Sequence, residues 1–118
     1  MSSESTHTLM QRIKVLELAE QTLWLLIRIN PENGCFNLTQ QSDRASIRVQ
    51  LRSTELDAVL PSGIRLTLLA DSGEIVQSIA ARDHDNGIQL KRFRCLLGTR
   101  FELQVSLNSE HLTEKVIV

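Results

Sequence analysis

The chain has 118 residues, a length that suits one domain and leaves no room for a second. It is 42% hydrophobic, and 13 basic against 14 acidic residues give a net charge of −1. This balance excludes a polycationic nucleic-acid binder and a disordered tail protein, and two cysteines exclude a disulfide-built secreted scaffold.

The N-terminal segment, residues 1–10, is polar and has no basic run followed by an apolar one. We therefore expect a disordered arm rather than a secretory signal. The longest apolar run, residues 23–27, ends at Arg28 and is far shorter than the ~20 residues that a bilayer span requires. We expect a cytoplasmic protein that does not bind a membrane.

Eight strands are predicted in chain order, at 11–18, 22–30, 45–52, 64–70, 74–82, 87–93, 100–107 and 112–118. Most alternate apolar and polar residues with period two, which is typical of antiparallel strands with one buried face. Residues 23–29 are apolar in both phases as far as Arg28, which favours a central strand. Residues 9–27 also fit a helical stripe, so a short N-terminal helix stays an alternative. Asp71-Ser72-Gly73 predicts a tight hairpin turn.

These elements predict an all-β fold, an about eight-stranded, mostly antiparallel two-layer β-sandwich (Ig-like or jelly-roll-like) over residues 11–118. Inside the strand at 87–93, Ile88 and Leu90 share a face and Phe93 is out of phase by one, which a bulge or a strand end would resolve. The predicted core comprises Trp24, Leu26, Ile47, Val49, Leu51, Leu66, Leu68, Ile79, Leu90, Phe101, Leu103 and Val105.

Three stretches resemble the C-terminal module of an uncharacterised protein family from photosynthetic bacteria. They read RIKVLEL from residue 12, LPSGIRLTLLADSGEIVQSIAARDHDNGIQLKRF from residue 60, and GTRFELQVSLNSEHLTEKVIV from residue 98. Members of that family usually carry a longer polar segment ahead of the module, and a Gly-Glu-Pro-Gly-Glu-like corner where this chain has residues 94–99. The resemblance implies a fold and a bacterial lineage, and no activity or cofactor.

Asp71 carries the sharpest enzymatic alternative. Asp71-Ser72-Gly73 resembles the turn of single-lobe aspartic proteases, in which a homodimer places two carboxylates side by side to share one proton. Glu74 stands where that site needs a small residue, and a surface hairpin turn accounts for the same residues. We therefore expect no enzyme.

The strongest local charge bias lies in Lys91, Arg92, Phe93 and Arg94, followed by Arg100, with no acid between residues 86 and 101. An acidic protein partner suits this basic stretch. A solvated basic edge that discourages sheet aggregation is the plainer interpretation. Single-stranded nucleic acid would need a second aromatic residue and a basic chain, so we expect no nucleic-acid binding.

No metal or cofactor is expected. Residues 83–87 (Asp-His-Asp-Asn-Gly) lack the glycine and glutamate positions of a calcium loop, and no further zinc ligands stand at suitable spacing. Cys35 and Cys95 are expected to be unpaired thiols. The resulting hypothesis is a non-catalytic protein-interaction or regulatory module, with a homodimer through a sheet edge also possible.

Overall fold

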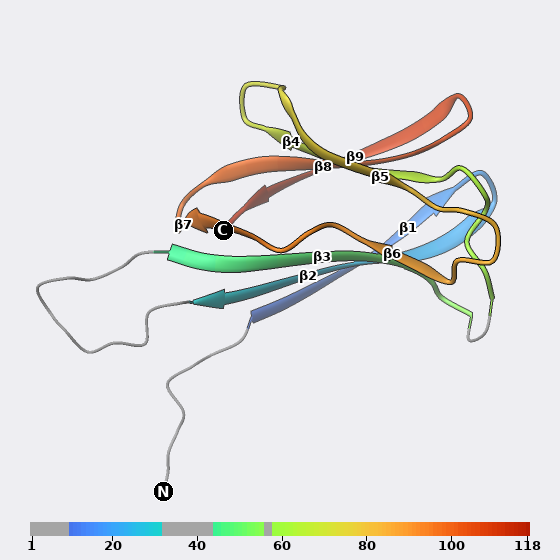
Figure 1. The fold of residues 1–118 in the computed structure, drawn as a ribbon, viewed down its shortest axis with the longest axis horizontal. Helices are drawn as coiled ribbons and strands as arrows, with labels where there is room; N and C mark the ends of the chain where they lie inside the picture. Colours follow the sequence, from blue (N-terminus) through green and yellow to red (C-terminus); the bar gives the residue numbers. More distant parts are fainter. Residues whose placement is uncertain (1–9, 32–43, 56–57) are drawn as a thin grey trace, which may run out of the picture.

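The computed structural model describes residues 10–31, 44–55 and 58–118, and these ranges form nine strands and no helix. Two antiparallel sheets lie one above the other (Figure 1). The all-β sandwich is confirmed, and residues 10–18 form a strand rather than the alternative helix. The strands are β1 (Met10–Leu18), β2 (Gln21–Pro31), β3 (Arg44–Ser53), β4 (Arg65–Ala70), β5 (Ile75–Ala80), β6 (Gly87–Gln89), β7 (Phe93–Leu96), β8 (Arg100–Leu107) and β9 (Glu110–Ile117).

The five-stranded sheet has the order β1-β2-β3-β6, and β7 pairs with β3 beyond the end of β6. The four-stranded sheet has the order β5-β4-β8-β9. Its β4–β5 hairpin turns at Asp71-Ser72-Gly73, as predicted, and Gly73 has φ +92°, which L residues rarely adopt. Ala19 and Glu20 both have positive φ in the two-residue turn between β1 and β2, as the favoured hairpin twist requires.

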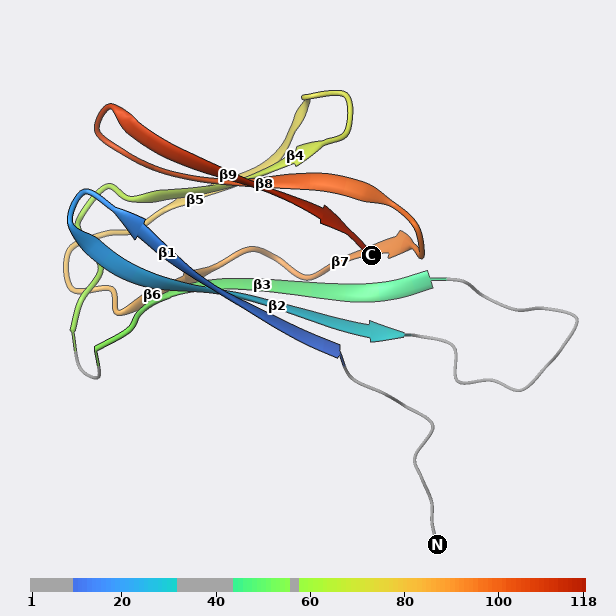
Figure 2. The same ribbon diagram turned by 180° about the vertical axis from the view of Figure 1, so that it is seen from behind.

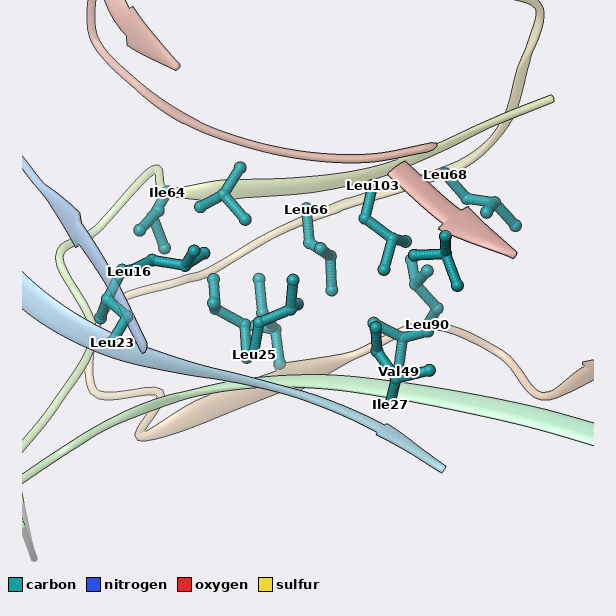
Figure 3. Packing of buried hydrophobic residues seen from close by; sticks show 14 of the residues in the cluster. Leu16, Leu23, Leu25, Ile27, Val49, Ile64, Leu66, Leu68, Leu90 and Leu103 are labelled. Carbon is teal, nitrogen blue, oxygen red and sulfur yellow. The ribbon is translucent and has the colours of Figure 1, made fainter. Parts of the chain in front are cut away.

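The core lies between the two sheets and is built from alternate residues of each strand (Figure 3). The β2 part of the predicted core was wrong by one residue. Leu23, Leu25 and Ile27 are buried, whereas Trp24 is 41% exposed on the outer face and Leu26 is half-buried there. Arg28 explains which residues of β2 face inward. Trp24 and Arg28 lie on the same face of the strand, so placing Trp24 inward would also bury the Arg28 guanidinium between the sheets.

The other predicted core residues face the interior. Ile79 packs against the core but is only half-buried. The remaining nine are buried, namely Ile47, Val49, Leu51, Leu66, Leu68, Leu90, Phe101, Leu103 and Val105.

The strand predicted at 87–93 is two strands, which is why nine strands form instead of eight. β3 advances three residues from Ile47 to Gln50, while its partner chain advances four, from Gln89 to Phe93. This extra residue resolves the phase slip seen in the sequence, since it returns Phe93 to the inner side. There the Phe93 ring meets Phe101 of the opposite sheet edge-to-face, with centroids 5.5 Å apart.

Polar links join the two sheets along both open sides of the sandwich. On the side seen in Figure 2, Lys14 of β1 forms an ion pair with Glu114 of β9 at 3.3 Å, and the Arg12 guanidinium donates to the Ile117 carbonyl. On the other side, the Gln77 amide of β5 donates to the Lys91 carbonyl and accepts from the Lys91 backbone N–H. The sandwich edges are therefore held by polar contacts.

Two expectations fall outside the described residues. The N-terminal arm was predicted over 1–10, of which only Met10 is described, as the first residue of β1. Cys35 is also outside, so its pairing with Cys95 stays a prediction.

Candidate functional site

The structure divides the predicted basic stretch among three environments. Arg92 and Arg94 lie on the outer face of the five-stranded sheet, and Lys91 is exposed beside them. Phe93 points the other way, into the space between the sheets. Arg100 begins β8, where it alternates with buried Phe101 and so lies on the outer face of the four-stranded sheet.

Two arginines that the sequence did not connect with this stretch join Arg92. Arg28 of β2 and Arg48 of β3 are directly opposite each other in register, and both are exposed. Together with Asn30 and Ser46, the three arginines line an open hollow of about 200 Å³. We call these five residues the arginine hollow.

The arginine hollow concentrates positive charge without compensation from the described residues. Like charges directly opposite on neighbouring strands are destabilising. Arg28, Arg48 and Arg92 form no ion pair or side-chain hydrogen bond with any residue that the structure describes. Ser46 is 8% exposed, and its hydroxyl is open to the solvent of the hollow, since no buried side-chain polar atom of the described residues lacks a hydrogen-bond partner. The hollow is therefore equipped to bind an anion.

An exposed apolar patch adjoins the arginine hollow along β2. It consists of two cross-strand pairs, Ile13 with Leu26 and Val15 with Trp24, on the outer face of β1 and β2. Ile13 is 53% and Val15 60% exposed. Trp24 and Leu26 also line a groove of about 400 Å³ that extends toward residues 52–55 and Asn86. We call these four residues the apolar patch.

The outer face of the five-stranded sheet is basic although the whole chain carries a net charge of −1. At the outward-facing strand positions there is one acid, Glu17, among the described residues. The arginines at such positions are Arg28, Arg44, Arg48, Arg52 and Arg94. A partner that covers this face must therefore supply negative charge at the end where the arginine hollow lies.

The sequence indicates that the arginines of β2 and β3 face outward. Arg28 interrupts an apolar run, and Arg48 occupies the polar phase of its strand. What the sequence did not provide is the register that sets Arg28 against Arg48, because that register depends on how the chain returns between residues 31 and 44.

The other candidate sites stay separate from this face. Asp71 is exposed at the tip of the β4–β5 hairpin, in keeping with a surface turn. Within the described ranges, no group of three or more His, Cys, Asp or Glu side chains is placed to hold a metal ion, and no helix is long and apolar enough to span a membrane.

Burial raises the pKa of the half-buried Cys95 thiol, and its hydrogen bond with Thr99 lowers that pKa in part.

Comparison with known proteins gives one finding. The family described as "Protein of unknown function (DUF1822)" matches residues 2–117. No curated protein and no solved structure matches the chain.

Proposed function

The chain belongs to the DUF1822 family of proteins of unknown function, and we propose that it serves as a non-catalytic protein-interaction or regulatory module. Its binding surface is the outer face of the five-stranded sheet. The partner is an acidic protein that covers both the arginine hollow and the apolar patch.

The observation that carries this proposal is the adjacency of the two features on β2. Trp24 and Leu26 of the apolar patch and Arg28 of the hollow are successive outward residues of that strand. Large apolar side chains at the centre of an interface supply most of its affinity, and Trp and Arg are the residue types enriched there. Charged groups next to them select the partner and orient it.

The experiment compares capture of proteins from a native lysate by wild type and by two matched double variants. Val15→Thr with Trp24→Gln replaces one cross-strand pair of the apolar patch, and Ile75→Thr with Ile117→Thr replaces two exposed hydrophobic side chains of the four-stranded sheet. The proposal expects an acidic protein that wild type and the second variant retain. The first variant should lose it by about tenfold, since one lost apolar anchor can cost more than 1 kcal/mol.

A photo-crosslinking side chain at Gln89 or at Thr113 shows which face is in contact. Gln89 is an outward residue beside Gln50 on the proposed face, and Thr113 is an exposed residue of β9 on the opposite sheet. The acidic protein should cross-link at position 89 and not at 113. Equal cross-linking at both positions contradicts the proposed surface, and cross-linking only to a second copy of the chain replaces the acidic partner with a homodimer.

The setting of the module is part of the proposal. The sparse cysteines support a reducing compartment, and we propose the cytoplasm. We also propose that residues 12–118 correspond to the C-terminal module of longer proteins from photosynthetic bacteria.

A further inference from the structure

We propose that the arginine hollow binds a phosphoryl group carried by a side chain of the partner protein. This inference rests on the proposed function, because it names the chemical group that the binding face recognises. It assigns a specific anion site to Arg28, Arg48 and Arg92, of which only Arg92 belongs to the basic stretch of the sequence.

The three arginines line the hollow from three separate segments of chain. Arg28 and Arg48 are cross-strand neighbours, whose Cβ atoms lie about 5 Å apart in such pairs. Arg92 immediately precedes Phe93, which pairs with Ile47, so it reaches the same hollow from the far side of β3. The extra residue between β6 and β7 makes this possible, because it leaves Arg92 on the outer face while Leu90 and Phe93 both face inward.

The donors in the hollow outnumber what a carboxylate can accept. Each guanidinium has five N–H donors in a planar fork, and Asn30 and the Ser46 hydroxyl add neutral donors. A carboxylate presents two oxygens and one negative charge. A phosphoryl group presents three terminal oxygens and a charge of about −1.5 to −2, so that three arginine forks can each engage a different pair of oxygen lone pairs.

The size of the hollow agrees with a small ligand group. A volume of about 200 Å³ equals that of roughly seven water molecules, which is enough for one phosphoryl group with a partial hydration shell. Ser46 is 8% exposed, and its hydroxyl is open to the solvent that fills the hollow, since no buried side-chain polar atom of the described residues lacks a hydrogen-bond partner. A bound oxyanion would replace water as the acceptor for this hydroxyl and would relieve the repulsion between Arg28 and Arg48.

The experiment titrates ¹⁵N-labelled protein with three probes and follows backbone resonances by NMR. The probes are an acetyl-Ala-phosphoserine-Ala amide, the same peptide with Glu in place of phosphoserine, and inorganic phosphate. The expected result is saturable shifts at Arg28, Ser46, Arg48 and Arg92, with the phosphopeptide at least about tenfold tighter than the Glu peptide. Arg48→Gln should abolish these shifts, and Arg100→Gln, which removes a cation from the other sheet, should leave them unchanged.

Three results overturn the inference. Equal affinity for the Glu peptide makes the hollow a carboxylate site, and tighter binding of inorganic phosphate than of the phosphopeptide excludes a protein-borne group as the ligand. Shifts of similar size around Arg65 and Arg100 indicate unspecific accumulation of anions. The proposed function is tested separately, since the lysate partner can depend on the apolar patch whether or not the hollow selects phosphate.

Discussion

Replacing Arg48 with Gln should stabilise the free protein, because it removes a guanidinium that faces Arg28 across two strands and shares a hollow with Arg92. Taking a separation of about 6 Å for each pair, near the usual spacing of cross-strand neighbours, each repulsion in a water-like dielectric amounts to about 0.7 kcal/mol before screening and about 0.5 kcal/mol at 20 mM salt. The two pairs together give about 0.5–1 kcal/mol of added unfolding free energy, in line with measured cross-strand effects.

The assay is urea unfolding at 25 °C followed by the fluorescence of Trp24. For a urea dependence of about 1.5 kcal/mol per M, the Arg48→Gln midpoint should rise by about 0.3–0.7 M at 20 mM NaCl. The gain should shrink to about a third at 0.5 M NaCl, because exposed charges are screened at that salt concentration. Arg48→Lys keeps the charge and should show no gain.

A lower midpoint for Arg48→Gln than for wild type would refute the reasoning, as would a gain that does not depend on salt. Arg100→Gln serves as the control, since Arg100 lies on the other sheet and lines no part of the arginine hollow. Added phosphate should bring the urea midpoint of wild type closer to that of Arg48→Gln. Phosphate bound in the intact hollow stabilises native wild type, because a ligand that binds only the native state shifts the unfolding equilibrium toward it.

Three further predictions test the core, a turn and a thiol. Leu25→Ala should cost about 2–5 kcal/mol of unfolding free energy in urea titration and Leu26→Ala no more than about 1 kcal/mol, since only Leu25 is fully buried; similar losses would contradict the phase of β2. Gly73→Ala should cost about 1 kcal/mol in the same assay, although a Cβ there meets nothing within 4 Å, because φ is +92°; an unchanged midpoint would contradict this strain. In a Cys35→Ser background, Cys95 should react with iodoacetamide at pH 8 more slowly in the native than in the urea-unfolded protein. Its raised pKa keeps the thiol protonated, so stability should also fall as pH rises above the ordinary value of 9.0; equal alkylation rates would contradict the raised pKa.

The strand content of the fold could be predicted because a period of two survives in most of the strands. The phase of β2 was misjudged because residues 23–27 are apolar in both phases, so hydrophobicity alone leaves the inner face undecided. The deciding information was present in Arg28, since exposing Trp24 costs less than burying an unpaired guanidinium. Single charged residues inside an apolar run therefore deserve more weight than the identity of the largest side chain.

The arginine hollow could be predicted only in part. Arg92 was a candidate from its local charge, and Phe93 was placed beside it although its ring belongs to the core. Arg28 and Arg48 come from other strands, and their meeting depends on pairing between segments far apart in the sequence. Local patterns predict which face of a strand is polar, and the alignment between strands decides which polar residues become neighbours.

The pairing of β3 has a consequence for folding during synthesis on the ribosome. β3 ends at Ser53, yet the strands that cover its second edge, β6 and β7, are complete only at Leu96. At about 5–20 residues per second, translation leaves that edge open for roughly 2–9 s. Arg48 and Arg52 line the strand during this interval, and such cations discourage nascent chains from pairing with one another before the sheet is finished.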